Sequence, residues 1–183
     1  MRNAGTAFTL LIIFGFITTV IAMNWYPAAV IKMREKNGGH AHIVWKFQIR
    51  RVADSALMYY KNALKNGTST LTVSAALQED AYQKSRETLL ENLVVNDAIQ
   101  KQGFTTEAEA LITAKIKEYA AQPDFSVAVS LVYGLDNSGF VELMARPEAE
   151  RELLQEKNKW DDAALAAWIA EEKKQSRIVR FFK

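Results

Sequence analysis

The sequence predicts a mainly helical protein that begins with a transmembrane helix. Three observations carry this prediction: an uncharged apolar run near the N-terminus, apolar residues at helical spacing through most of the remaining chain, and glycines that end the helical segments. The chain has 183 residues, enough for one domain with a useful core plus an appendage. We therefore divide it into an anchor at residues 1–26, a juxtamembrane linker at 27–43 and a helical domain at 44–183.

The expected anchor is the run from Thr6 to Met23, which carries no charge and is dominated by Leu, Ile, Phe and Val. About 18–20 such residues span the hydrocarbon core of a bilayer. Trp25 and Tyr26 follow, and both residue types favour the membrane–water interface. The alternative is a cleaved signal peptide, because Val20-Ile21-Ala22 is an acceptable cleavage site.

Basic residues follow the anchor and bear on its orientation. Between Lys32 and Lys65 there are eight Lys or Arg residues against two acids, Glu35 and Asp54. Counting positive charges on each flank would keep the domain in the cytoplasm. This basic segment is either a solvated helix face or a surface that rests on anionic lipid head groups.

The first helix of the domain is expected from Val44 to Lys65, and Asn66-Gly67 would close it. Before it, Pro27 to Ile31 would run extended, and Asn37 to His40 would form a turn. The apolar face of this helix is made by Trp45, Ile49, Val52, Ala56, Tyr59 and Ala63.

The stretch from Thr88 to Gly134 contains helices whose ends are marked by local residues. A long helix capped by Ser74 would end at Gly103, because glycine adopts the left-handed conformation at little steric cost. A capping box formed by Thr106 and Glu109 would start the next helix. The element expected after it is a helix over Phe125–Tyr133, closed by Gly134 and started by Pro123-Asp124.

Beyond Gly134, two aspartates are expected to cap helices: Asp136 starts one segment, and Asp161 starts the last helix, which runs to about Gln175. Pro147 should kink or restart the intervening helix because it lacks a backbone donor. The tail is β-prone, and three placements are open: a short pairing of Ala28–Ile31 with Ile178–Phe182, packing into the helical core, or an exposed tail that binds a partner.

The sequence offers little for catalysis or cofactor binding. There is no cysteine, which excludes disulfides and thiolate zinc sites, and the two histidines, His40 and His42, make a poor metal site. No phosphate loop, dinucleotide fingerprint or nucleophile elbow is present. The formal net charge of +2 argues against a dedicated nucleic-acid binder. We therefore expect no enzyme, no cofactor, no metal and no nucleic-acid partner.

The phrase LLENLVVNDAIQKQGFTTEAEA resembles the N-terminal chaperone domain of the SurA family of periplasmic foldases (SurA, PrsA and PpiD types). PDFSVAVSLVYG followed by SGFVELMARPEAERELLQEK is similar to the next element of that family. The similarity covers roughly Ala75 to Lys157 and implies a compact multi-helix bundle. Family members often carry a parvulin prolyl-isomerase domain, for which this chain leaves no room after Lys157. The resemblance therefore implies the chaperone part without isomerase activity.

The resemblance implies a membrane-anchored domain that faces the periplasm or cell exterior, in conflict with the count of positive charges. Its expected function is holdase-like: binding unfolded or newly exported polypeptides through apolar burial, with residues 6–26 in the lipid. The alternative function is an anchored assembly protein that binds one fixed partner in an envelope complex. Six apolar and aromatic residues are the expected client contacts, although core packing is the commoner fate of such residues: Met58, Tyr60, Tyr82, Phe140, Met144 and Trp160.

Overall fold

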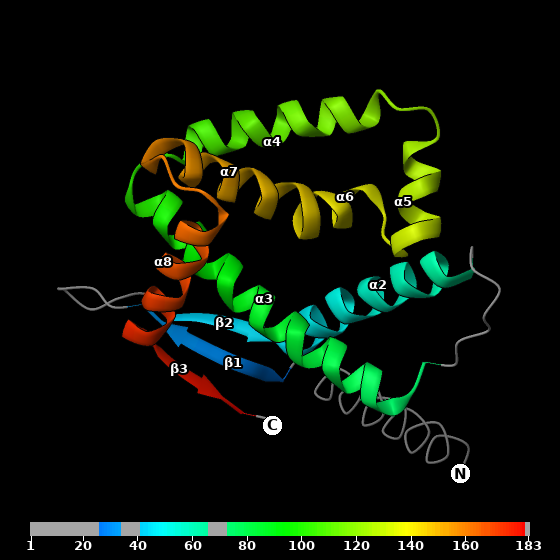
Figure 1. The fold of residues 1–183 in the computed structure, drawn as a ribbon, viewed down its shortest axis with the longest axis horizontal. Coiled ribbons are helices and arrows are strands. Elements are labelled where there is room, and N and C mark those ends of the chain that lie inside the picture. The colour runs from blue at the N-terminus through cyan, green and yellow to red at the C-terminus, as the bar shows by residue number, and fades with distance from the viewer. Residues whose placement is uncertain (1–25, 34–40, 66–72, 182–183) are drawn as a thin grey trace, which may run out of the picture.

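The computed structural model describes residues 26–33, 41–65 and 73–181. Within these ranges the chain is mainly helical, as expected, with a small three-stranded sheet at its margin (Figure 1). The expected anchor at residues 1–26 lies outside the described residues apart from Tyr26. In the described ranges, no helix has both the length and the apolar character needed to cross a membrane.

The sheet joins two parts of the chain that are far apart in sequence. Its strands are β1 (Pro27–Lys32), β2 (Ala41–Trp45) and β3 (Arg177–Arg180), in the order β2-β1-β3, and both pairings are antiparallel. Of the placements open to the tail, the pairing with Ala28–Ile31 is confirmed, since Ile31 lies opposite Ile178. Phe182, at the end of that expectation, lies outside the described residues.

Strand β2 lies where the sequence predicted part of a linker and the start of a helix, so both of these predictions are wrong. Residues 41–43, placed in a linker, pair with β1, as do Val44 and Trp45, which were placed in the first helix. That helix, α2, begins only at Lys46 and runs to Lys65. The side-chain Oε1 of Gln48 accepts a 2.9 Å hydrogen bond from the backbone N–H of Trp45, the reciprocal half of a capping box, so the helix starts where the strand ends. The expected closing residues Asn66-Gly67 lie outside the described ranges.

Helix α3 (Ala75–Lys101) begins and ends as expected. The Ser74 hydroxyl accepts a 3.2 Å hydrogen bond from the backbone N–H of Leu77, and Gly103 follows the helix at φ +75°. The capping box expected for α4 (Thr105–Ala120) is wrong, because Phe104 holds the N-cap position and no side chain caps it. Glu109 instead pairs with Arg146, at 2.6 Å.

The remaining elements follow in chain order: α5 (Phe125–Tyr133), α6 (Asn137–Phe140), the π-helical turn η1 (Val141–Ala145), α7 (Arg146–Asn158) and α8 (Asp162–Gln175). Asp136 and Asp161 cap helices as expected, each accepting a 2.7 Å hydrogen bond from a backbone N–H three residues on. The disturbance expected at Pro147 is the π-helical turn just before it. There the backbone N–H of Arg146 donates to the carbonyl of Val141, five residues back.

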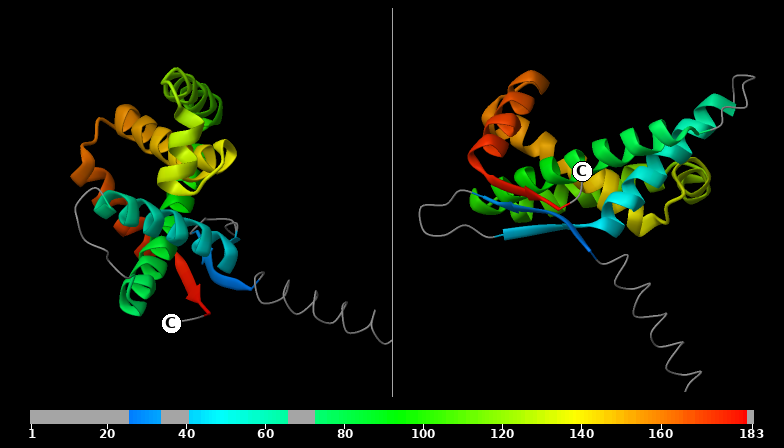
Figure 2. Two further views of the ribbon diagram at one scale, coloured as in Figure 1. Left: turned by 90° about the vertical axis from the view of Figure 1, so that its right-hand side faces the viewer. Right: turned by 90° about the horizontal axis from the view of Figure 1, so that it is seen from below.

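Helix α3 is central to the packing. On one side it covers the sheet, forming a core with Ala29, Ile31 and Val44. Its C-terminal half packs with α4, α7 and α8 in a second core that contains Ile99, Leu154 and other residues. A third core lies where α4, α5, α6 and η1 meet. Figures 1 and 2 show the resulting order, with α3 between the sheet and the layer made by α4 and α7.

Candidate functional site

A cleft of about 270 Å³ opens between β2, α2, α3, η1 and the start of α7. We refer to it as the cleft. Its position follows from the fold: α2 and α7 pack against different parts of α3, and the π-helical turn before Pro147 carries Leu143 into the space between them. The lining residues are Ile43, Val44, Gln48, Val52, Thr88, Leu89, Asn92, Leu93, Asn96, Glu142, Leu143, Arg146, Pro147 and Glu150.

The walls of the cleft are largely apolar. Leu89 and Leu93 are one helical turn apart on α3, and Val52 faces them from α2. Leu143 and Pro147, also four residues apart, contribute the wall on η1 and α7. All five side chains are only partly buried, so apolar surface remains open to a ligand.

Polar side chains occupy the end of the cleft where α3 and α7 meet. Glu150 of α7 is 3% exposed. Its Oε1 accepts a 2.8 Å hydrogen bond from Nδ2 of Asn96 and lies 3.8 Å from Nη1 of Arg146. Burial raises the pKa of the Glu150 carboxyl, and the hydrogen bond from Asn96 and the charge of Arg146 only partly oppose this rise. This end of the cleft is therefore polar, with the Glu150 carboxyl held between the Asn96 carboxamide and the Arg146 guanidinium.

Carboxamides give the cleft its capacity for directed hydrogen bonds. Gln48, Asn92 and Asn96 all line it. Each side-chain oxygen already accepts one hydrogen bond within the protein and has a second lone pair, and each carboxamide nitrogen carries two N–H donors. A peptide group needs one donor and one acceptor, so side chains of this kind match the main chain of an extended polypeptide. Together with the apolar walls, they suit a short segment whose side chains enter the cleft while its backbone meets the carboxamides.

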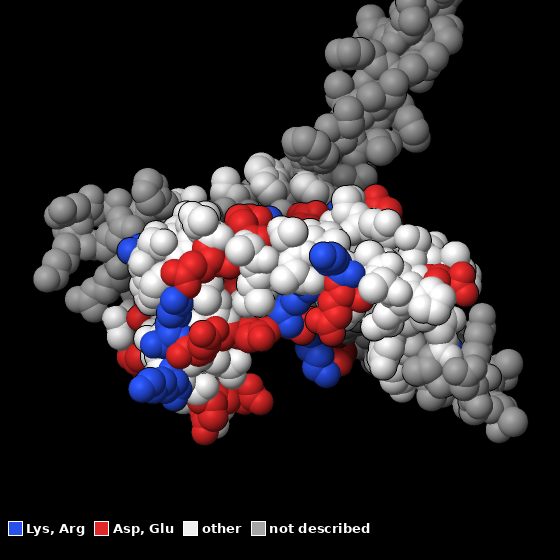
Figure 3. Space-filling model, turned by 90° about the horizontal axis from the view of Figure 1, so that it is seen from above, with Lys and Arg blue, Asp and Glu red and all other residues white. Residues whose placement is uncertain are grey.

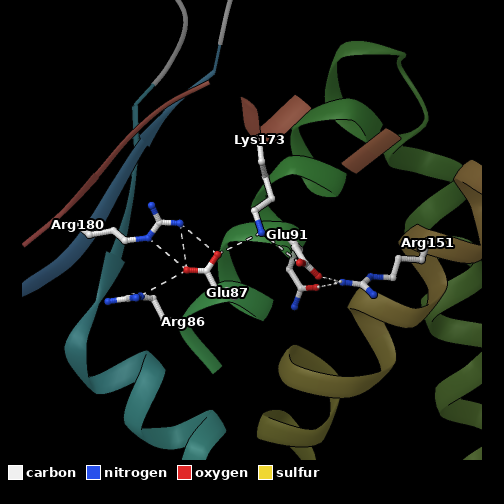
Figure 4. A network of polar contacts seen from close by, with 7 residues as sticks. Arg86, Glu87, Glu91, Arg151, Lys173 and Arg180 are labelled. Atoms are coloured by element: carbon white, nitrogen blue, oxygen red, sulfur yellow. Dashed lines mark hydrogen bonds and ion pairs between the residues drawn. The ribbon is translucent and has the colours of Figure 1, made fainter. Parts of the chain in front are cut away.

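A network of ion pairs joins α3 to β3, α8 and α7, beside the cleft (Figure 4). Glu87 receives hydrogen bonds of 3.1–3.2 Å from Arg180 of β3 and of 3.2 Å from Lys173 of α8. Lys173 also contacts Glu91 at 3.2 Å, and Glu91 lies 3.6 Å from Arg151 of α7. Burial alone would raise the pKa of Glu87, but its two basic partners outweigh burial and lower it. We call this set the Glu87 network.

Two other depressions have less suitable chemistry. A space of about 550 Å³ between α3, α7 and α8 is rimmed by Glu91, Glu148, Glu152 and Asp162 together with Arg151 and Lys173. Figure 3 shows that acidic and basic side chains are interspersed on the upper face of the molecule, which α4 and α7 form. An open groove between α2 and α3 combines apolar residues and two carboxamides with the charged residues Arg50, Asp54 and Lys61. The cleft differs in having longer apolar walls, made by residues of four helical elements.

The six client contacts expected from sequence do not line the cleft and are not gathered in one place. Phe140 is a correction: at 8% exposed it lies in the third core, in edge-to-face contact with Tyr119 and Phe125. Met144 packs against the same core, and Trp160 packs on Trp168 beside the second core, with ring centroids 5.4 Å apart.

The other three expected contacts lie on α2 and α3. Met58 and Tyr82 line the charged groove between these helices, where the Tyr82 hydroxyl donates to the carbonyl of Lys46 at 3.5 Å. Tyr60 is exposed on α2. Sequence reasoning missed the cleft because its lining comes from five separate elements, and no local pattern marks Asn96 and Glu150 as neighbours.

Of the two histidines, His42 lies on β2 with its Nε2 3.8 Å from a carboxylate oxygen of Asp97, and His40 is outside the described residues. The described residues contain no group of three or more His, Asp or Glu side chains placed to hold a metal ion.

Comparisons with known proteins found no relative. No protein-family model matches the chain, no curated protein matches it, and no solved structure matches it.

Proposed function

We propose that the protein is a membrane-anchored extracytoplasmic chaperone that binds short segments of unfolded or newly exported polypeptides in the cleft. The observation that carries this proposal is the combination of partly exposed apolar walls with carboxamide side chains in one cleft. The resemblance of Ala75–Lys157 to the SurA-type chaperone domain supports the same function.

The size of the cleft fits weak, exchangeable binding. At about 270 Å³ it holds a few side chains and not a folded domain. Burying one Leu or Val side chain contributes about 1.5–3 kcal/mol, so two such side chains contribute on the order of 3–6 kcal/mol before ordering costs. The expected dissociation constant is therefore on the order of tens of micromolar to several millimolar. A holdase needs contacts of this strength, because tight binding would trap its client.

Site-specific cross-linking tests the proposal directly. The chain has no cysteine, so a Val52→Cys variant carries a single thiol in the cleft, to which a photoactivatable benzophenone can be attached. The probe is a β-barrel outer-membrane protein diluted from urea in the presence of the labelled chain. We expect cross-links to the unfolded probe, and competition by excess unfolded but not folded protein.

The matched control is Leu131→Cys with the same label. Leu131 lies on α5, is 64% exposed and does not line the cleft. Equal cross-linking from positions 52 and 131, or cross-linking of folded and unfolded probe alike, would show that the cleft is not the binding site.

One observation favours the alternative function, an anchored assembly protein with a single folded partner. Val127 and Leu131 lie one turn apart on α5 and are both exposed, and Tyr59 of α2 stacks on Tyr133 nearby, with ring centroids 5.4 Å apart. Exposed apolar side chains one turn apart on a helix are typical of protein–protein contacts. Loss of complex formation in Leu131→Ser, with unfolded-chain binding unchanged, would favour this alternative.

A further inference from the structure

We propose that one face of the sheet rests on the surface of the membrane, beside the expected anchor, and so sets the orientation of the cleft relative to the bilayer. This inference rests on the membrane anchorage in the proposed function and deepens it. We call this surface the outer sheet face. Its residues are Val30, Lys32, Ile43, Arg177, Val179 and Phe181.

Strand alternation separates the two faces of the sheet. Ala29, Ile31 and Ile178 point toward α3, where they are buried or packed against the core. Arg180, two residues after Ile178, reaches Glu87 on the same side. Val179 lies between Ile178 and Arg180 and therefore points away from α3. Val30, directly opposite Val179 on β1, points away from α3 as well. In both views of Figure 2 the sheet lies at the margin of the domain.

The outer sheet face is apolar at its centre. Val179 is 39% exposed, and Phe181, two residues further along the same face, is 50% exposed. Val30 lies between Val179 and Ile43 in the cross-strand register. Ile43, on the edge strand, also borders the cleft, so the two surfaces adjoin. A row of this kind presents apolar and aromatic side chains to whatever lies against the sheet.

All the charge on this face is positive. Lys32 and Arg177 face each other across β1 and β3, next to the apolar row. The three strands contain no Asp or Glu, whereas α3, α4, α7 and α8 carry acids and bases together. Aliphatic and aromatic side chains bordered by Lys and Arg are the composition of surfaces that settle into the head-group region of anionic bilayers.

The position of β1 in the chain identifies the membrane as the occupant. Only Asn24, Trp25 and Tyr26 separate the apolar run ending at Met23 from the start of β1 at Pro27. At no more than about 3.6 Å per residue, this spacer places Pro27 within about 14 Å of Met23. The head-group region extends roughly 5–8 Å beyond the hydrocarbon core on each side. A segment anchored by the apolar run therefore holds the sheet within reach of the lipid surface.

Fluorescence quenching in vesicles tests the inference with the full chain. A single cysteine at Val179→Cys is labelled with an environment-sensitive fluorophore, and the protein is reconstituted in phosphatidylcholine vesicles with or without phosphatidylglycerol. The lipid includes a nitroxide quencher near the head group. We expect blue-shifted emission and strong quenching from position 179, with several-fold weaker quenching from the control Leu131→Cys. Phe181→Cys is the second reporter if the first substitution disturbs folding.

Charge neutralisation is the second arm of the test. In Lys32→Gln/Arg177→Gln, quenching at position 179 should fall, and the loss should be larger in vesicles that contain phosphatidylglycerol.

Protein that floats with the vesicles but shows no quenching at position 179 would overturn this inference while leaving the anchorage intact. A blue shift at position 179 that persists in detergent and grows with protein concentration would also overturn it, and would indicate a second copy of the chain as occupant. Failure to float with the vesicles would overturn the anchorage itself, and this inference with it. The cross-linking test of the cleft is independent of all three outcomes.

Discussion

Asn96 of α3 and Glu150 of α7 meet at the polar end of the cleft, joined by a 2.8 Å hydrogen bond from the Asn96 carboxamide to the Glu150 carboxylate. The two residues are 54 positions apart in sequence. Their contact ties the helix that covers the sheet to the helix that follows the π-helical turn. It also places a carboxyl group with a raised pKa next to the apolar walls, so the polarity of the cleft depends on a group that titrates.

Glu150→Gln should flatten the dependence of stability on pH. Because the pKa of Glu150 is raised above its ordinary value of 4.5, the folded protein holds this proton at pH values where the unfolded chain has released it. The resulting stability is full below pH 4.5 and is lost as the pH rises through the folded-state pKa. The carboxamide of the Gln variant would stay neutral at every pH and would still accept the hydrogen bond from Asn96. Urea unfolding across this pH range measures the effect, and Glu118→Gln, at an exposed position, is the control.

Glu87→Gln should loosen the attachment of β3 and α8 to α3. The lowered pKa of Glu87 means that its ionised form stabilises the fold above the ordinary pKa of 4.5, and this stability is lost as the pH falls through the folded-state pKa. Since the side chain is 35% exposed, solvent screening limits the effect at neutral pH to about 1 kcal/mol.

Hydrogen exchange of the β3 amides and the urea midpoint report the Glu87→Gln effect. The control is Glu171→Gln, whose partner Lys174 is also on α8 and 75% exposed. If the β3 amides exchange at the same rate in both variants and the two urea midpoints agree, the Glu87 network does not hold β3 in place.

Gly134→Ala should destabilise the protein more than Gly103→Ala does. Both glycines have positive φ, +66° and +75°, so alanine is strained by about 1 kcal/mol at either position. At Gly134 a Cβ atom would also lie 2.6 Å from Sδ of Met58, whereas at Gly103 nothing lies within 4 Å. We expect a total loss of about 2 kcal/mol at Gly134.

Thermal or urea unfolding measures both glycine variants. Combining Gly134→Ala with Met58→Ala should recover the part of the loss due to the close contact, which a double-mutant cycle isolates. Purely additive losses would mean that Met58 moves aside without cost.

Leu143→Ser should weaken the binding of unfolded polypeptide. Its side chain lines the cleft from η1, and removing that apolar surface should cost about 1–1.5 kcal/mol of binding, roughly a fivefold to tenfold rise in the dissociation constant. Fluorescence anisotropy of a labelled unfolded peptide gives the constant. Leu131→Ser, outside the cleft, should bind with the wild-type constant, and circular dichroism should show that both variants keep their helix content.

Local signals in the sequence predicted the helices well because each signal acts within a few residues. Ser74, Asp136 and Asp161 cap their helices through backbone groups three residues away, and Gly103 and Gly134 take the left-handed conformation where the periodic pattern stops. The capping box at Thr106 and Glu109 was wrong because a distant partner, Arg146, takes the Glu109 side chain. No pattern around Glu109 reveals that competition.

The sheet and the cleft depend on pairings between distant residues. Trp45 and Val44 continue the apolar pattern of α2, so periodicity alone placed them in that helix. They belong to β2 instead, because they pair with β1, Val44 lying opposite Ala29. Phe140 was a candidate client contact, with core packing as the commoner fate, and three ring contacts show that it packs in a core. In the cleft, Gln48, Asn96 and Leu143 come from three helices whose crossing is a property of the packed fold.

Because β1 lies between β2 and β3, the sheet cannot be completed until β3 has been synthesised. During synthesis, β1 and β2 are made before any described helix, whereas β3 is made after all of them. Until Arg177–Arg180 has been made, one edge of β1 lacks its backbone partner and offers unpaired amides and carbonyls to other chains. At this stage the domain is itself an incompletely folded polypeptide with an exposed strand edge that can pair with other chains. A stall in elongation just before β3 would prolong that stage and favour self-association through the strand edge.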